Sequence, residues 1–430
     1  MAALLNLTAF DAILKEHYTP ERVKKLAFTN HPLLGMIPKM ESMTGKKYVV
    51  PIAYGTPQGT GAAFLSAQAA KRASDFEAWE LTRVQGYGFI DIDNETMEAS
   101  MGDLGAFMEA RQQEIDGLLD TMARNIALDL YGNGYGVRGR IAAVSTTLVT
   151  LTNKEDAINF EVGMRITVSA SNSTPGAGAL RGANVSSGDG DSGEFVTLVA
   201  VDRSAGTITA DANWTTVFGA GDAGGAAAVN DYLHRWGDKS FGTAATRRRM
   251  SGLEAWIPAS APSSTAFFGV DRSVDTDRLG GIRVDGSAMT VEEALIEGGT
   301  RAFIQGGTPD TCLMNPVHFG ELVKSLGSKV NYDVAKSSDG QIGFKTVGVW
   351  TPAGYIKCVP DPDCPKGRAL LLDMGTVKLY SLGGAPKLLS HDGLIALRNS
   401  TSDSVEVRAG FYGQLGVSAP GRNVRIALAT

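Results

Sequence analysis

The most regular pattern in the sequence is a stripe of hydrophobic residues between Asn94 and Tyr131. Its members recur at steps of three, four and seven residues, which places them on one face of an α-helix. A helix over this range would be about 55 Å long, well beyond the usual globular helix. Gly102, Gly105 and Gly117 weaken the pattern locally and allow a bend or a break near its start. The stripe consists of Met97, Met101, Leu104, Met108, Ile115, Leu118, Met122, Ile126 and Leu130.

The pattern before this helix predicts a β-hairpin preceded by an extended arm. Every second residue from Tyr48 to Tyr54 is apolar, and residues 76–83 give a second strand-like run. The connection between them, residues 55–75, is rich in Gly, Ala, Ser and Gln and offers almost nothing for a core. The first 44 residues hold short helical patches broken by Pro and Gly. We expect both segments to become ordered by lying on a neighbouring chain.

The composition changes after the helix and predicts a small inserted all-β module over residues 141–236. This range is dense in Val, Thr, Gly, Ala and Ser, with turn signals between short apolar runs. The predicted strands are 147–151, 165–169, 195–201, 207–209 and 232–234.

The remainder of the chain, residues 237–430, mixes helical and strand patterns. Thr290 and Glu293 form a capping box that opens a helix to about Ile304. A second helix begins at Asn315-Pro316 and runs to Leu326. The closing strands are predicted at 369–372, 377–380, 394–398, 405–411 and 424–428.

Composition and charge exclude several function classes. The formal net charge of −6 gives no global attraction to nucleic acid or to anionic membranes. The 52 glycines and the few aromatic residues favour many turns and an extended, β-rich shape. No secretion signal and no uninterrupted run of 18 apolar residues occurs, so we expect a cytosolic product without a membrane span. Cys312, Cys358 and Cys364 are expected to be buried free thiols.

Motifs for catalysis or metal binding are weak. The glycine-rich run 132–139 follows a helix, so a helix-to-sheet turn is favoured over a phosphate loop. Residues 189–194 lack the ligands that complete a calcium loop, and Asp271, Asp275 and Asp277 have arginines beside them. The histidines are scattered without metal-ligand spacing. We therefore predict no enzyme activity, no metal and no cofactor. The histidines are His17, His31, His234, His318 and His391.

The order of these parts resembles the major capsid proteins of tailed bacteriophages, the fold first described for phage Hong Kong 97. Local phrases support the likeness: Phe28 to Leu34, Phe267 to Ser273 and Pro420 to Arg425. The resemblance implies an α+β fold with an N-terminal arm, an extended-loop hairpin, a long spine helix, and peripheral and axial domains. The matching ranges are 1–44 for the arm, 45–93 for the hairpin, 94–140 for the spine helix and the start of the peripheral domain, 141–236 for the inserted β-rich domain, and 237–430 for the axial domain and returning peripheral strands.

The resemblance also implies function and partners. The expected function is self-assembly into hexamers and pentamers of an icosahedral virion head that encloses double-stranded DNA, built in the host cytoplasm. A fused scaffold is expected to be absent, so a separate scaffolding protein could take part, besides portal and decoration proteins. Some members form a Lys–Asn crosslink at the hairpin, but we predict none, because no motif places the partner Asn or the activating Glu. The donors available would be Lys46, Lys47 and Lys71.

Candidate contact residues follow from the segments that cannot fold alone. Trp79 could equally pack on its own subunit. The basic run Arg247, Arg248 and Arg249 could touch DNA or a neighbour, and a solvated basic turn is as good an interpretation. Two other functions stay open: an encapsulin-like shell around cargo proteins, and a β-rich binding module or adhesin. The candidate inter-subunit residues are Phe28, Leu33, Tyr54, Phe64, Lys71, Arg72, Trp79 and Trp214.

Overall fold

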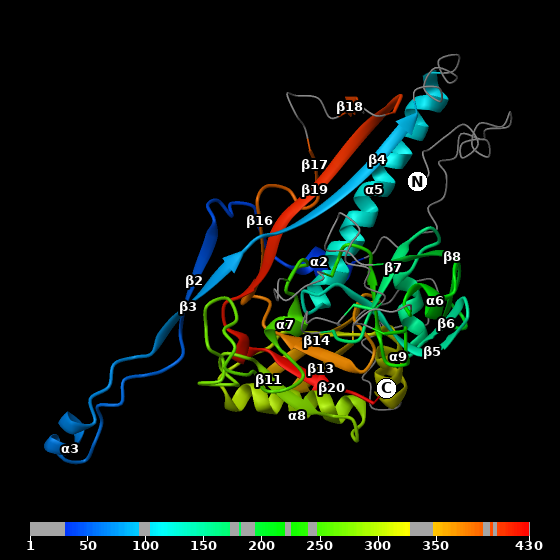
Figure 1. Cartoon of the computed structure of the whole chain (residues 1–430). Coiled ribbons are helices and arrows are strands. Elements are labelled where there is room, and N and C mark those ends of the chain that lie inside the picture. The colour runs from blue at the N-terminus through cyan, green and yellow to red at the C-terminus, as the bar shows by residue number, and fades with distance from the viewer. Residues whose placement is uncertain are drawn as a thin grey trace, which may run out of the picture.

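The chain forms a thick body from which two extended parts project in opposite directions (Figure 1). One projection is a narrow hairpin, and the other is a two-stranded ribbon with a long helix beside it. A small barrel sits at the side of the body. The computed structural model describes residues 31–93, 104–172, 180–181, 194–219, 225–239, 247–326, 347–389, 396–398 and 402–429.

The body is built on a six-stranded mixed sheet in the order β11-β20-β15-β12-β14-β13. Helices α8 and α9 pack against one face of this sheet through the cluster that includes Leu295 and Leu322. The predicted capping box is confirmed, since the Thr290 Oγ1 accepts from the Glu293 amide and the Glu293 carboxylate accepts from the Thr290 amide. The elements are β11 (Ile282–Asp285), α8 (Val291–Ile304), β12 (Thr311–Met314), α9 (Pro316–Leu326), β13 (Val347–Thr351), β14 (Gly354–Pro360), β15 (Arg368–Leu372) and β20 (Val424–Ala427).

The ribbon consists of β4 (Val84–Asp93) and β19 (Ser404–Val417), which pair antiparallel along the whole of β4. Helix α5 (Leu104–Tyr131) runs along the ribbon and confirms the predicted long helix over the described residues. The start expected at 94–103 lies outside them. Shorter strands extend the sheet: β1 (Lys39–Met40), β16 (Val377–Ser381), β17 (Lys387–Leu388) and β18 (Ala396–Arg398).

The predicted β module is a closed barrel with strand order β10-β5-β6-β9-β8-β7. The barrel closes because β10 pairs with both β5 and β7, which leaves no open edge. Strand β5 begins four residues before the predicted start at 141. The elements are β5 (Val137–Ser145), β6 (Leu148–Leu151), the 3₁₀ helix η1 (Lys154–Asn159), β7 (Arg165–Ser169), β8 (Val196–Asp202), β9 (Thr207–Ala210), α6 (Trp214–Val217) and β10 (Tyr232–Arg235).

The hairpin and its junction with the body complete the architecture. Strands β2 (Lys47–Ala53) and β3 (Phe76–Thr82) pair over seven residues, as predicted, and the short helix α3 (Phe64–Ala69) lies at the far end. At the base, helix α2 (Pro32–Met36) enters the main core. Two further short helices lie in the body, α7 (Leu253–Trp256) and η3 (Pro420–Arg422).

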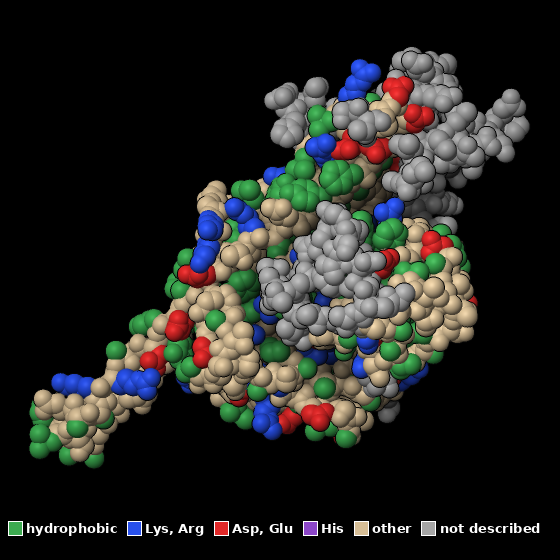
Figure 2. All heavy atoms as spheres, viewed as in Figure 1, with side chains coloured by type: hydrophobic (Ala, Val, Ile, Leu, Met, Phe, Trp, Pro, Cys, Tyr) green, Lys and Arg blue, Asp and Glu red, His purple; other side chains and the backbone are tan. Residues whose placement is uncertain are grey.

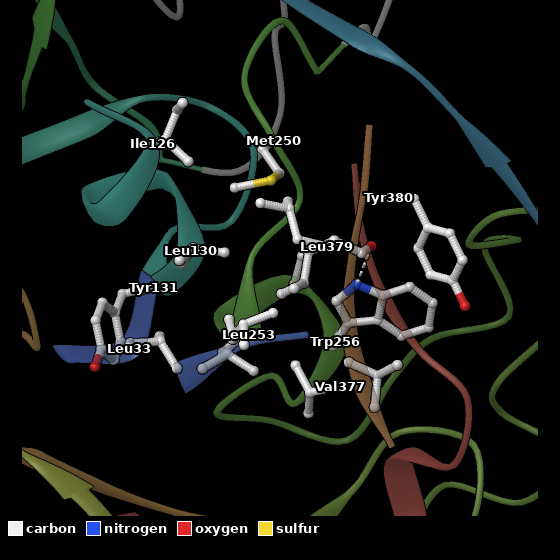
Figure 3. Close-up of a cluster of buried hydrophobic side chains, with 14 of the residues drawn as sticks. Leu33, Ile126, Leu130, Tyr131, Met250, Leu253, Trp256, Val377, Leu379 and Tyr380 are labelled. Carbon is white, nitrogen blue, oxygen red and sulfur yellow. Dashed lines mark hydrogen bonds between the residues drawn. The ribbon is translucent and has the colours of Figure 1, made fainter. Parts of the chain in front are cut away.

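Three separate hydrophobic cores hold these parts. The largest joins α2, the end of α5, α7 and the strands that enter the body, with Leu33, Leu130 and Trp256 at its centre (Figure 3). The second lies under α8 and α9, and the third fills the barrel. Cys312 and Cys358 face each other as register partners of β12 and β14, and both are buried free thiols, as is Cys364.

Close packing between ribbon and helix depends on Gly88 of β4. A Cβ atom at this position would lie 2.7 Å from Leu118 Cδ1 and 3.2 Å from Met122 Sδ, both on α5. At Gly86, two residues earlier on the same strand, the nearest atoms would lie 3.8 Å away.

Gly88→Ala should therefore lower the free energy of unfolding by about 1–3 kcal/mol, because the overpacked helix has to shift. Gly86→Ala is the matched control and should change it by much less. Urea denaturation of the subunit measures both values, and equal effects of the two substitutions would contradict the packing argument.

Candidate assembly surfaces

The tip of the hairpin exposes hydrophobic side chains that no part of the described subunit covers. Helix α3 has no buried residue, and the Phe64 and Leu65 side chains are 82% and 77% exposed. This follows from the sequence, since the glycine- and alanine-rich tip supplies no apolar partners. Large exposed apolar side chains on a projecting element are typical of a protein interface.

Positive charge lies beside this apolar tip. Lys71 and Arg72 follow α3 and are exposed, and Arg72 forms an ion pair with Asp75 at 3.1 Å. Figure 2 shows the Lys and Arg side chains next to the hydrophobic end of the hairpin. The tip is therefore both apolar and cationic.

The outward face of the ribbon carries exposed aromatic rings. Alternation along β4 turns Gly88 toward α5 and places Tyr87 and Phe89 on the opposite face, where they are 50% and 58% exposed. Tyr412 of β19 adds a third ring, 5.8 Å from Tyr87 between centroids. Figure 2 shows hydrophobic side chains gathered over the middle of the ribbon.

Carboxylates continue the same face toward the far end of the ribbon. Asp91 and Asp93 follow Phe89 at alternate positions, and Glu406 is the register partner of Asp91. Partial burial and then the charge of Glu406 raise the pKa of Asp91. Arg408 pairs with Glu406 and lies over the Phe89 ring. We call the face formed by Tyr87, Phe89, Asp91, Asp93 and Glu406 the acidic-aromatic face.

Three of the predicted contact residues are instead buried inside the subunit. Trp79 packs edge-on against Trp256, with ring centroids 5.0 Å apart. Leu33 lies in the same core, and Trp214 fills the barrel core. All three side chains are almost completely inaccessible, so they stabilise the subunit and are not carried into the proposed contacts.

The remaining predicted contacts have mixed positions. Phe64, Lys71 and Arg72 are exposed at the hairpin tip. Tyr54 is half-buried against the main core, and its carbonyl accepts a hydrogen bond from Arg278 at 2.6 Å. Phe28 lies outside the described residues.

The basic run at 247–249 is used largely within the fold. Arg249 bonds Asp129 of α5 at 2.7 Å and approaches Asp238 at 3.6 Å. Arg138 of the barrel reaches Asp238 at 3.4 Å. Burial would raise the pKa of Asp238, but Arg249 and Arg138 hold it below its usual value. This network ties barrel, helix and body together, and sequence alone could not pair residues so far apart.

The other two arginines of the run also have contacts inside the subunit. Arg247 lies over the rings of Tyr135 and Phe267. Arg248 donates to the Gly237 carbonyl at 3.2 Å. The run is thus neither a simple solvated turn nor a free basic patch.

A polar cavity of about 270 Å³ separates the barrel from the body. Charged residues of both parts line it, among them Asp156 and Arg138 of the barrel and Arg368 and Glu254 of the body. Arg368 and Glu254 form an ion pair at 3.1 Å. Burial raises the pKa of Asp156 to about 6, although Arg368 opposes the shift.

Among the described residues, no cluster of His, Cys, Asp or Glu could hold a metal ion. Asp271 accepts from Ser273, Asp275 pairs with Arg278, and Asp277 pairs with Arg283. No helix in the same ranges is long and apolar enough to cross a membrane.

Comparison with known proteins gives a consistent result. The family model described as SU10 major capsid protein matches residues 234–394. The Cyanophage A-1(L) capsid asymmetric unit contains a chain of the same fold, with a TM-score of 0.51 and 13% identity over 98% of each chain. No curated protein sequence matches. The chain therefore has the fold of a phage capsid chain, and the region that matches the capsid family model lies in the body and the end of the barrel.

Two further solved structures have lower scores. The capsid of Cyanophage P-SCSP1u has a TM-score of 0.43 and 11% identity, covering 98% of this chain and 94% of that chain. The holo-SrpI encapsulin complex from Synechococcus elongatus has a TM-score of 0.43 and 9% identity, covering 99% and 95%. The family model is that of a phage capsid protein, and it favours a structural role in a virion.

The titration of Asp156 should make the stability of the protein pH-dependent. Its pKa is higher in the fold than the ordinary 3.8, so its contribution is fully present below that value and is lost as the pH rises through about 6. Asp156→Asn should therefore raise the free energy of unfolding at pH 7.5 by on the order of 2 kcal/mol and leave it unchanged near pH 3.5.

Denaturant unfolding of the wild type and the variant at both pH values measures this difference. Glu194→Gln removes a carboxylate elsewhere in the same module and serves as the control. A variant that is less stable than the wild type at pH 7.5 would contradict the burial argument.

Proposed function

We infer that the chain assembles with copies of itself into hexamers and pentamers that tile an icosahedral head around double-stranded DNA. The observation that carries this proposal is the match between two surfaces of one chain. The hairpin tip is apolar and cationic, whereas the acidic-aromatic face of the ribbon is apolar and anionic. A contact between the two surfaces buries apolar side chains of both and brings opposite charges together.

The geometry supports a contact between different copies. Hairpin and ribbon project from the body in opposite directions, so a tip cannot lie on the ribbon of its own chain (Figure 1). A contact between unlike patches of identical subunits is head-to-tail, and it closes into a ring when the rotation between subunits allows it. Rings of five and six subunits are the units from which icosahedral shells are built.

The parts of the chain then take the roles expected of this fold. Residues 1–44 act as the arm, the β2–β3 hairpin as the extended loop, and α5 as the spine helix. The ribbon belongs to the peripheral domain, and the sheet with α8 and α9 to the axial domain. The barrel is the proposed inserted domain, and its first strand begins at Val137, four residues before the expected range 141–236. Separate scaffolding, portal and decoration proteins are further proposed partners.

Negative-stain electron microscopy of the purified protein tests assembly itself. We expect closed shells or rings of five and six subunits, and DNA in shells recovered from infected cells. Shells that copurify with an enzyme in place of DNA would favour the encapsulin-like function. A compact species smaller than a pentamer, even with the scaffolding protein present, would favour the binding module.

Charge reversal tests the proposed contact. Lys71→Glu combined with Arg72→Glu should abolish or strongly reduce shell formation, because the tip would repel the acidic-aromatic face. Adding Asp91→Lys and Asp93→Lys should restore assembly in the same chain, since the pair of surfaces is again complementary.

Sedimentation velocity at low and moderate salt measures the assembled fraction of each variant. The wild-type fraction should fall as salt rises, because exposed charges are screened. The proposed contact is wrong if the double variant assembles like the wild type, or if the variant with all four substitutions fails to assemble. Either result can occur while the wild-type protein forms shells.

A further inference from the structure

A buried aspartate connects the start of the described chain to two distant elements. Asp361 follows β14 and is fully buried. Its Oδ2 accepts hydrogen bonds from the Leu33 amide of α2 at 3.1 Å and from the Tyr131 hydroxyl at the end of α5 at 2.7 Å. Its Oδ1 accepts from the Asp363 amide at 2.9 Å. Figure 3 shows Leu33 beside Tyr131 in the main core.

The bond to Leu33 replaces a missing helix cap. Helix α2 has only five residues, and its N-cap residue, His31, makes no side-chain hydrogen bond to the free amides of the first turn. Pro32 occupies the first helical position and has no amide to satisfy. The next amide is that of Leu33, and an aspartate normally caps it from within the chain. Here the aspartate comes from the far end of the sequence.

A second aspartate of the same turn holds His31, the first residue that the structure describes. His31 Nδ1 lies 2.6 Å from Asp363 Oδ2, and both side chains are 7% exposed. The turn that carries Asp361 and Asp363 is itself fixed, because Asn315 donates to the Cys364 carbonyl at 2.8 Å. The contacts of Asp363 with His31 and of Asp361 with Leu33 therefore fix residues 31–33.

Burying these carboxylates is costly for the subunit. Burial raises the pKa of Asp361 despite the three donors around it. Replacing a whole buried polar cluster with well-packed apolar residues is often neutral or stabilising for a fold, so a role of these groups in specifying geometry is consistent with their presence.

We propose that Asp361 and Asp363 form an arm anchor that fixes the direction in which the N-terminal segment leaves the subunit. The inference rests on the proposed function, since an arm that lies on a neighbour must start from a defined position. Asp361 is the main positioning residue, because its carboxylate alone satisfies donors from α2 and α5 together. Asp363 holds the chain at His31, the residue directly before α2.

Asp361→Asn discriminates this role from simple stabilisation. An amide offers one acceptor oxygen where the carboxylate offers two, so its NH₂ group must face either the Leu33 amide and Tyr131 hydroxyl or the Asp363 amide. The cap is therefore lost or weakened while size is kept. Tyr131→Phe is the matched control, because it removes one bond to Asp361 and leaves the bond to Leu33 intact.

Hydrogen–deuterium exchange of the full-length, unassembled subunit is the readout. With Asp361→Asn, amides of residues 33–37 should exchange at least about tenfold faster, whereas amides of α8 and the barrel should keep wild-type rates. With Tyr131→Phe, exchange at 33–37 should stay within about twofold of the wild type. Asp363→Asn should give an intermediate increase confined to the same residues.

Two results would overturn the arm anchor. Unchanged exchange at 33–37 in Asp361→Asn means that the carboxylate does not hold α2. A uniform increase across the chain in both Asp361→Asn and Tyr131→Phe means that Asp361 only stabilises the fold. Because the subunit is measured before assembly, neither result depends on whether shells form. Electron microscopy of Asp361→Asn then tests the link to assembly, with a mixture of irregular and closed particles as the expected outcome.

Discussion

The packing of Trp79 against Trp256 is the interaction on which the arrangement of the projecting parts depends. Trp79 lies at the base of the hairpin, and its ring meets Trp256 and Phe267 at centroid distances of 5.0 and 6.3 Å. The neighbouring Glu80 amide donates to the Phe268 carbonyl at 2.9 Å. These contacts fix the base of β3, so the tip is carried at a defined place although it has no core of its own. The indole N–H of Trp79 finds no acceptor among the described residues, a cost that the buried ring area outweighs.

The parts of the subunit are joined in two ways, one by apolar packing and the other by polar contacts. The hairpin, α2 and α5 enter one continuous hydrophobic core, which is packed too closely to deform gradually. The barrel has a separate core and meets the body across a charged cavity and the network of Asp129, Arg138, Asp238 and Arg249. The strength of ion pairs depends on charge state and geometry more than on buried area. A change of pH can therefore alter this second junction.

Local sequence patterns predicted the helices and strands well. They could not predict the contacts between residues that lie far apart along the chain. The capping box at Thr290 and the alternation in the hairpin involve residues within a few positions of each other, so sequence suffices. From sequence, Trp79 could equally contact a neighbouring chain or pack on its own subunit, because its own segment offers no partner and Trp256 lies far away along the chain. The same applies to Arg249, whose aspartate partners are Asp129 of α5 and Asp238 of the turn that follows the barrel. Barrel closure also depends on distant strand pairs, β10 with β5 and β10 with β7.

The weakness of each proposed contact between hairpin tip and acidic-aromatic face suits a shell. An exposed ion pair such as those available to Lys71 and Arg72 contributes about 0.2–1 kcal/mol at most, and an apolar tip of a few side chains adds a modest amount. A single wrong contact is therefore released quickly. In a closed ring every subunit both gives and receives the same contact, so removing one subunit breaks two of them together. Error correction during growth and stability after closure then follow from one weak, repeated interaction, provided that the body holding both surfaces stays rigid.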